Sequence, residues 1–252
     1  VPGCIANGID EKTANKIYDE MIDFAKYAFN KSHAAAYAVV SYQTAWLKYY
    51  YPVEFMAALM TSVIDNPGKV SEYIYSCRQM GIKILPPDIN KGEGSFSVDS
   101  GNIRYGLAAI KSIGKPVIES IIKERKNGGP FSNLKDFIER LSGKEVNKRT
   151  IESFIKSGAF DSLGGTRKQF MVVYVQILDQ VNRERKYSMT GQLSLFDIVS
   201  DDQKSEFDIP LPDVGEYEKE TKLAFEKEVL GVYLSGHPLE DYEEKWRKNI
   251  SR

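Results

Sequence analysis

The stretch LAAIKSIGKPVIESIIKER, residues 107–125, decides the fold of this chain. Large apolar side chains recur at helical spacing on both sides of Gly114, which predicts two short helices rather than one long helix. Pro116 suits the first turn of the second helix, because the first N–H groups of a helix have no partner within it and proline has no N–H. We therefore predict a tight turn at residues 111–115 between the two helices.

A turn of this kind can bind phosphate. The first N–H groups of the second helix point outward, where a phosphate can accept them, and Lys111 and Lys115 lie beside the turn. Contacts of this type read the nucleic-acid backbone, so binding is independent of base sequence and weakened by salt. The pattern resembles the helix-hairpin-helix of DNA-binding proteins, with Ser112 in place of the first glycine of the usual Gly-x-Gly turn. We expect phosphate contacts from Lys111, Ser112, Gly114 and Lys115; the alternative is a purely structural pair of helices.

A second unit of the same kind follows at residues 146–171, VNKRTIESFIKSGAFDSLGGTRKQFM. Its apolar positions lead to glycine-containing turns, and Thr166 can cap the helix after the second turn. The surrounding residues 101–190 carry 17 Lys and Arg against 9 Asp and Glu, and such an excess of positive charge attracts phosphate. Further phosphate contacts are expected from Lys148, Arg149, Gly164, Thr166, Arg167 and Lys168.

Hydrophobic periodicity predicts a mainly α fold. Before residue 82, helices are predicted at 10–28, 34–51, 53–64 and 69–81. The second of these is rich in Ala and Tyr, which is the composition of a buried helix. Alternating apolar residues on either side of Asp99-Ser100-Gly101-Asn102 predict a short β-hairpin between this helical portion and the tandem hairpin module. A last amphipathic helix is predicted at roughly 216–230.

The segment GQLSLFDI, residues 191–198, places large apolar side chains between a basic run and an acidic run. An extended peptide of this composition suits a small pocket on a partner, with Gln192 at the rim and Leu195 and Phe196 as apolar anchors. The alternative is a staple that packs back on the hairpins. QLSLF is similar to the sliding-clamp-binding motif of bacterial DNA polymerases and repair proteins. The expected clamp-binding residues are Gln192, Leu193, Ser194, Leu195 and Phe196.

Longer segments carry a more specific resemblance. YAFNKSHAAAYA at 27–38, together with SYQTAWLK at 41–48, closely resembles the fingers region of the family C replicative polymerases, the bacterial DNA polymerase III alpha subunits. SGAFDSLG at 157–164 and EKEVLGVYLSGHPL at 226–239 resemble the same family further along, in the same order. The resemblance implies a fragment of such a polymerase. Its parts would be 1–94 from the fingers, 95–186 as β-hairpin and DNA-binding module, 187–215 as clamp-binding linker, and 216–252 as a helical lead-in to a truncated oligonucleotide-binding domain.

The same resemblance implies a role in DNA replication. The aspartates of the family's catalytic palm do not occur in this sequence, so the fragment should lack polymerase activity alone, and Mg²⁺ is expected only for the full-length DNA-directed DNA polymerase. Fingers domains contact the incoming triphosphate, and the residues expected to do so here are Asn30, Lys31, Ser32 and His33. For His33, a structural role is the alternative. The implied partners are DNA without sequence preference, the sliding clamp and other replisome subunits.

Composition limits the remaining possibilities. No apolar run is long enough to span a membrane, and no signal peptide or Cys/His cluster occurs, so we expect a cytoplasmic protein without disulfide or zinc site. One rival hypothesis is a free-standing helix-hairpin-helix adaptor that binds DNA and recruits a partner. Another is a small hydrolase that uses His33 or His237 with Cys4 or Cys77, although neither cysteine has a flanking motif.

Overall fold

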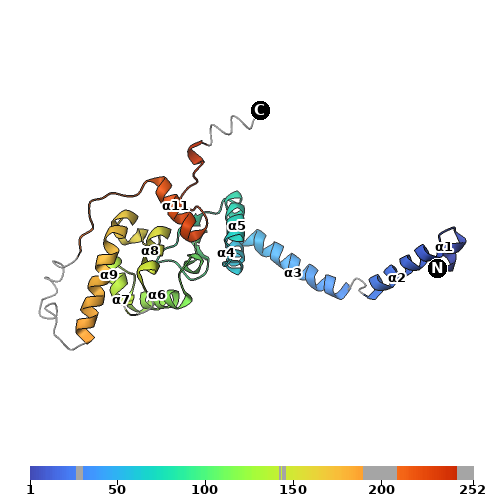
Figure 1. The fold of residues 1–252 in the computed structure, drawn as a ribbon, viewed down its shortest axis with the longest axis horizontal. Coiled ribbons are helices and arrows are strands. Elements are labelled where there is room, and N and C mark those ends of the chain that lie inside the picture. The colour runs from blue at the N-terminus through green and yellow to red at the C-terminus, as the bar shows by residue number, and fades with distance from the viewer. Residues whose placement is uncertain (27–30, 142, 144–145, 190–208, 243–252) are drawn as a thin grey trace. The chain divides into compact units, whose positions relative to one another are not determined.

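The computed structural model describes residues 1–26, 31–141, 143, 146–189 and 209–242 (Figure 1). The fold is mainly α, as predicted, with one small sheet. The chain divides into two compact units, Val1–Pro52 and Val53–Arg252. The helices that follow Pro52 share the hydrophobic core of the second unit, so the compact units meet at a different point from the division near residue 94, which stays a prediction.

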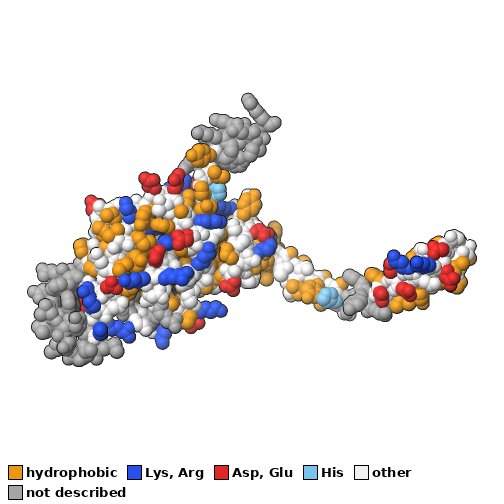
Figure 2. Space-filling model, in the orientation of Figure 1, with side chains coloured by type: hydrophobic (Ala, Val, Ile, Leu, Met, Phe, Trp, Pro, Cys, Tyr) orange, Lys and Arg blue, Asp and Glu red, His pale blue; other side chains and the backbone are white. Residues whose placement is uncertain are grey.

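The first unit consists of α1 (Pro2–Ala6), α2 (Glu11–Lys26) and α3 (Lys31–Tyr50). Asp10 caps α2 by accepting a hydrogen bond from the Thr13 N–H at 2.9 Å, and this bonding to Thr13 lowers the pKa of the Asp10 carboxyl. The prediction that α3 is buried is wrong within this unit, since none of its residues is buried. Figure 2 shows hydrophobic side chains along the surface of both longer helices.

The second unit begins with a helical pair and a three-stranded sheet. Its first elements are α4 (Pro52–Ser62), α5 (Pro67–Gln79), β1 (Ile84–Leu85), β2 (Ser97–Asp99) and β3 (Asn102–Arg104). The strand order is β1-β3-β2, with β1 parallel and β2 antiparallel to β3. The predicted hairpin is confirmed: Asp99 pairs with Asn102 across a two-residue loop. Ser100 and Gly101 have φ of 53° and 76°, as a type I′ turn requires.

Helices form the remainder of the second unit. They are η1 (Leu107–Ala109), α6 (Lys115–Gly128), α7 (Leu134–Leu141), α8 (Lys148–Ser157), η2 (Asp161–Leu163), α9 (Arg167–Met189), α11 (Lys219–Leu230) and η5 (Glu240–Tyr242). The helix α8 lies between α9 and α11, and α7 packs against α9 (Figure 1). This arrangement brings α11 onto α8, in the second predicted hairpin.

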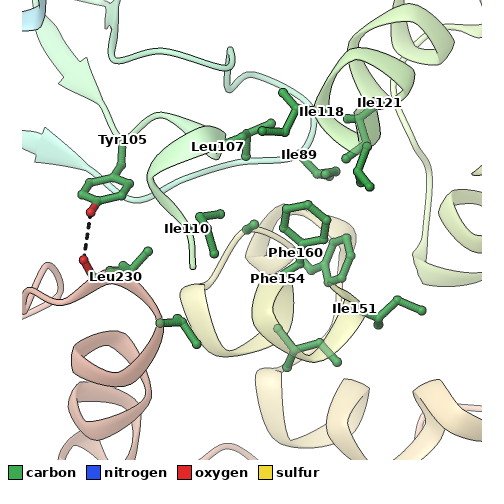
Figure 3. Packing of buried hydrophobic residues seen from close by; sticks show 14 of the residues in the cluster. Ile89, Tyr105, Leu107, Ile110, Ile118, Ile121, Ile151, Phe154, Phe160 and Leu230 are labelled. Carbon is green, nitrogen blue, oxygen red and sulfur yellow. Dashed lines mark hydrogen bonds between the residues drawn. The ribbon is translucent and has the colours of Figure 1, made fainter. Parts of the chain in front are cut away.

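Aromatic rings occupy the centre of this core. The rings of Phe137, Phe154 and Phe160 meet edge to face, with centroid distances between 4.9 and 6.0 Å. Figure 3 shows Phe154 and Phe160 facing Ile110 and the loop that follows β3. At the edge of the core, the Tyr105 hydroxyl donates to the carbonyl oxygen of Leu230 at 3.1 Å, which joins the sheet region to the end of α11 (Figure 3).

The cysteines do not form a reactive site among the described residues. Cys77 is buried in the core, and burial raises the pKa of its thiol to about 11. A thiol of this kind is almost wholly protonated near pH 7, so it is a poor nucleophile. The hydrolase hypothesis therefore loses one of its two candidate nucleophiles, while Cys4 lies on the short helix α1 in the other unit.

Candidate nucleic-acid interface

The first hairpin has the tight turn predicted at residues 111–115. Ser112 has a φ of 70°, in the left-handed region, so the serine takes the conformation that glycine usually takes at this position. A non-glycine residue in this region costs about 1 kcal/mol or more. The burial of Ile110 next to the turn offsets this cost, because the turn lets the chain pass from η1 to α6 while Ile110 stays in the core.

The start of α6 is open. Gly114 is its N-cap residue, with φ −80° and ψ 151°, and no side chain makes a capping hydrogen bond there within the described chain. A Cβ atom built on Gly114 would meet only Cδ of Pro116, at an ordinary contact distance of 3.6 Å. Neither φ nor internal packing therefore requires glycine at this position. The missing side chain instead leaves the first N–H groups of α6, beside exposed Lys115, accessible to an anion.

Lys111, a predicted phosphate contact, is bonded to the end of α11 in this structure. Its ammonium donates to the carbonyl oxygen of Glu228 at 2.9 Å, and its N–H donates to the carbonyl oxygen of Val229 at 2.9 Å. Both acceptors belong to the last turn of α11, where a helix presents unpaired carbonyl groups and a negative dipole end. Lys111 therefore caps the C-terminus of α11 and joins it to the first hairpin, and its phosphate contact stays a prediction.

The start of α8 is already capped. Asn147 accepts a hydrogen bond from the Thr150 N–H at 3.0 Å. The ammonium of Lys148 lies 3.4 Å from a carboxylate oxygen of Asp179, in an exposed ion pair that a phosphate could replace. Arg149 is exposed beside it. Both side chains remain candidates for phosphate contacts, whereas the backbone of this turn does not.

The start of α9 is also occupied. Thr166 caps the helix as predicted, and it forms a reciprocal pair with Gln169. The Thr166 N–H donates to Oε1 of Gln169 at 2.9 Å, and the Gln169 N–H donates to Oγ1 of Thr166 at 3.2 Å. The N–H groups of Arg167 and Lys168 donate to the carboxylate of Glu216 at 3.4 and 3.2 Å. Gly164, in the preceding turn, has a φ of 80° that favours glycine.

Arg167, a predicted phosphate contact, is a buried structural residue in this fold. The residue is 4% exposed, and its guanidinium donates to Asp161 at 2.9 Å, to Glu226 at 3.3 Å and to the carbonyl oxygen of Lys156 at 3.3 Å. Burial opposes the charged form, but the carboxylates of Asp161 and Glu226 outweigh it and raise the pKa of Arg167. A guanidinium held on three sides inside the protein cannot reach DNA.

Glu226 is not among the residues predicted from the sequence, although it holds Arg167 in place. This carboxylate is fully buried; besides Arg167, it accepts hydrogen bonds from the N–H groups of Leu234 and Ser235 at 2.9 and 3.0 Å. One signal was present: Glu226 lies three residues after Leu223 and four before Leu230, on the apolar face of α11. An acidic residue on a buried face requires a partner, and here that partner is Arg167.

Other arginines of the basic region also hold the fold. Arg125 donates to the carbonyl oxygens of Ile89 and Gly92 at 3.2 and 2.8 Å, and Arg140 donates to that of Glu124 at 2.6 Å. Figure 2 shows Lys and Arg interspersed with Asp and Glu on the visible face of the second unit. The charge excess of residues 101–190 therefore overstates the positive surface available to a phosphate backbone.

The predicted triphosphate site lies in the first unit. Lys31, Ser32 and His33 form the exposed first turn of α3, and the His33 ring lies 4.4 Å from that of Tyr37. Asn30 lies outside the described residues, as do the predicted clamp-binding residues Gln192, Leu193, Ser194, Leu195 and Phe196.

The described residues contain no group of three or more His, Cys, Asp or Glu side chains placed to hold a metal ion. Within the same part of the chain, no helix has the length and apolar character needed to cross a membrane.

Known proteins resemble this chain over the region of the two hairpins and beyond it. A family model described as a helix-hairpin-helix motif matches residues 81–170. The chain is 43% identical over 99% of its length to the DNA polymerase III subunit alpha of Vibrio cholerae, and 44% identical over 95% of its length to that of Escherichia coli K12. It is 42% identical over 94% of its length to that of Mycobacterium tuberculosis H37Rv. The chain spans 20–22% of the length of these relatives.

Replacing Arg167 with alanine tests the distinction between structural and surface cations. We expect Arg167→Ala to lower the free energy of unfolding by about 3–5 kcal/mol, because it leaves the carboxylate of Glu226 buried without its charge partner. The matched variant Lys168→Ala should cost no more than about 0.5 kcal/mol, since that side chain is only partly buried. Urea unfolding followed by circular dichroism measures both. Equal, small losses would contradict the structural role.

Proposed function

The chain is homologous, over almost its whole length, to a segment of the DNA polymerase III alpha subunits, and we propose that this segment binds the DNA backbone and recruits the sliding clamp for the replicative polymerase. Template-directed synthesis, with the Mg²⁺ that it requires, is proposed for a whole alpha subunit, of which the chain spans about a fifth. The rival hypothesis of an adaptor without polymerase ancestry loses its support, because the similarity to alpha subunits extends over 94–99% of the chain.

The open start of α6 is the observation that carries DNA binding. Three features meet there. No side chain of the described chain caps the first N–H groups of α6, Gly114 has space for a Cβ atom that it lacks, and Lys115 is exposed. The start of α6 also lies inside the region that matches the helix-hairpin-helix model. These groups recognise a phosphate but no base edge, so the proposed binding has no sequence preference. Lys148 and Arg149, at the start of α8, supply a second exposed group of positive charges.

Two substitutions test the first hairpin. Lys115→Ala should weaken binding to duplex DNA about five-fold to ten-fold and lower the slope of log K against log salt by about 0.9, the value for one phosphate contact. Gly114→Ala should leave the fold intact, because φ is −80° and space is available, yet weaken binding by placing a Cβ before the N–H groups. Fluorescence anisotropy at several salt concentrations measures both.

Lys126→Ala is the matched control for these variants. It removes the same charge from an exposed position at the other end of α6. Its salt slope should equal that of the unaltered chain. If all three variants bind DNA alike, α6 does not begin at a phosphate site.

The clamp contact is proposed from the sequence QLSLF at 192–196, a segment outside the described residues. Leu195→Ala together with Phe196→Ala should abolish binding to the sliding clamp and leave DNA affinity unchanged, because the two apolar anchors are separate from the hairpins. Surface plasmon resonance with immobilised clamp measures the loss. Val199→Ala, an apolar change outside the motif, should have no effect. Undiminished clamp binding by the double variant would remove this part of the proposal.

The triphosphate contact is proposed for the first turn of α3. Lys31 and His33 are exposed at a helix N-terminus, whose dipole favours an anion. In the complete alpha subunit, Lys31→Ala with His33→Ala should raise the KM for the incoming nucleotide about ten-fold, the equivalent of about 1.4 kcal/mol of binding. Lys12→Ala, which removes an exposed charge from α2, serves as the control. A KM that responds equally to both changes would argue against a specific contact.

A further inference from the structure

The chain after the undescribed segment returns to the second hairpin and lies across it. We call residues 209–218 the strap. Gln169 donates from its side-chain amide to the carbonyl oxygen of Pro212 at 2.9 Å, and the Thr166 hydroxyl donates to that of Gly215 at 2.7 Å. A Cβ atom on Gly165 would lie 2.9 Å from a methyl group of Leu211. The strap therefore covers the turn that leads into α9.

The strap places a carboxylate where a phosphate would bind. Oε1 of Glu216 accepts from the Lys168 N–H at 3.2 Å, and Oε2 accepts from the Arg167 N–H at 3.4 Å. The Tyr217 N–H donates to Oε1 at 2.7 Å and holds the carboxylate in position. These are the first N–H groups of α9, which the hairpin would otherwise offer to a phosphate oxygen. A second anion cannot bind the same groups at the same time.

The reciprocal pair of Thr166 and Gln169 caps only the Gln169 N–H of α9, and it leaves the N–H groups of Arg167 and Lys168 to Glu216. Glu216 is exposed rather than buried, so the contact contributes little to the core, and a phosphate could approach the same N–H groups from solvent. At the corresponding place in the first hairpin, no carboxylate contacts the start of α6 within the described chain. The two hairpins therefore differ chiefly in whether the chain supplies its own anion.

We infer that Glu216 closes the second hairpin to DNA, and that it decides which of the two hairpins can bind phosphate through its backbone. The inference rests on the proposed DNA-binding function and assigns it to the first hairpin, with the second available only when the strap is displaced. Glu216 competes with phosphate for the first N–H groups of α9. Its effective concentration there is high, because the bond from Thr166 to the carbonyl oxygen of Gly215 holds the neighbouring residue against the hairpin.

A test of the inference removes the negative charge of Glu216 and measures DNA binding. Glu216→Gln keeps an Oε1 that can accept from Lys168 and Tyr217, but it removes the negative charge. Glu218→Gln is the matched control: it removes the same charge two residues away, and the Glu218 side chain makes no capping hydrogen bond to α11. Both variants would be titrated against a labelled duplex DNA at several salt concentrations, using the whole 252-residue chain.

Glu216→Gln should tighten DNA binding about three-fold to ten-fold at low salt and steepen the salt slope by about 0.9, because one further phosphate contact forms. Glu218→Gln should change affinity less than about two-fold, with the slope unchanged. Adding Lys168→Ala to Glu216→Gln should remove part of the gain. An unchanged slope in Glu216→Gln, or an equal gain in both single variants, would overturn the inference.

Failure of the inference is distinguishable from failure of the proposed function. If Lys115→Ala reduces DNA binding while Glu216→Gln has no effect, the first hairpin binds DNA but Glu216 is not a competitor. If neither change alters binding, the proposed function itself fails, and the inference fails with it. Glu216→Gln keeps the contacts that Thr166 and Gln169 make with the strap, so we expect it to stay folded. Thermal unfolding of each variant checks this.

Discussion

A buried ion pair between Arg167 and Glu226 is the interaction on which the second unit depends. Arg167 begins α9, and it also binds Asp161 of η2 and the last turn of α8. Glu226 belongs to α11 and in turn binds the N–H groups of the chain that follows this helix. Burying two charges is costly unless both are fully hydrogen-bonded, and here both are supplied with several partners. The pair thus fixes the second hairpin, α11 and the following segment in a single arrangement.

The division of labour between arginine and lysine follows from their chemistry. Arginine presents several N–H groups in a rigid plane, so Arg125 binds two carbonyl oxygens of the loop between β1 and β2, and Arg140 binds two at the end of α6. Lysine ends in a compact charge on a long chain, and Lys115 carries it at the surface. A count of positive charges cannot separate these roles. For DNA binding, only the exposed cations and the open helix start supply the attraction, which points to a contact with few phosphates.

The two hairpins are alike as sequence patterns and unlike as binding surfaces. Both connect helices through a turn with a residue in the left-handed region, Ser112 in the first and Gly164 in the second. The start of α6 is left open, whereas that of α9 carries a side-chain cap and the carboxylate of Glu216. The proposed backbone contacts from one hairpin would therefore be weak and independent of base sequence.

The sequence by itself determined the local elements. Periodicity located most of the helices, the Asp-Ser-Gly-Asn stretch specified the turn between β2 and β3, and Thr166 indicated a helix start. The same local patterns located the Ser112 turn and the open Gly114, since each depends on neighbours along the chain. The roles that only the tertiary structure decided depend on distant partners. Arg167 meets Glu226 59 residues away, Lys111 meets Glu228 117 residues away, and the start of α9 meets Glu216 49 residues away. Local spacing sets backbone conformation, whereas the role of a charge depends on which groups packing brings beside it.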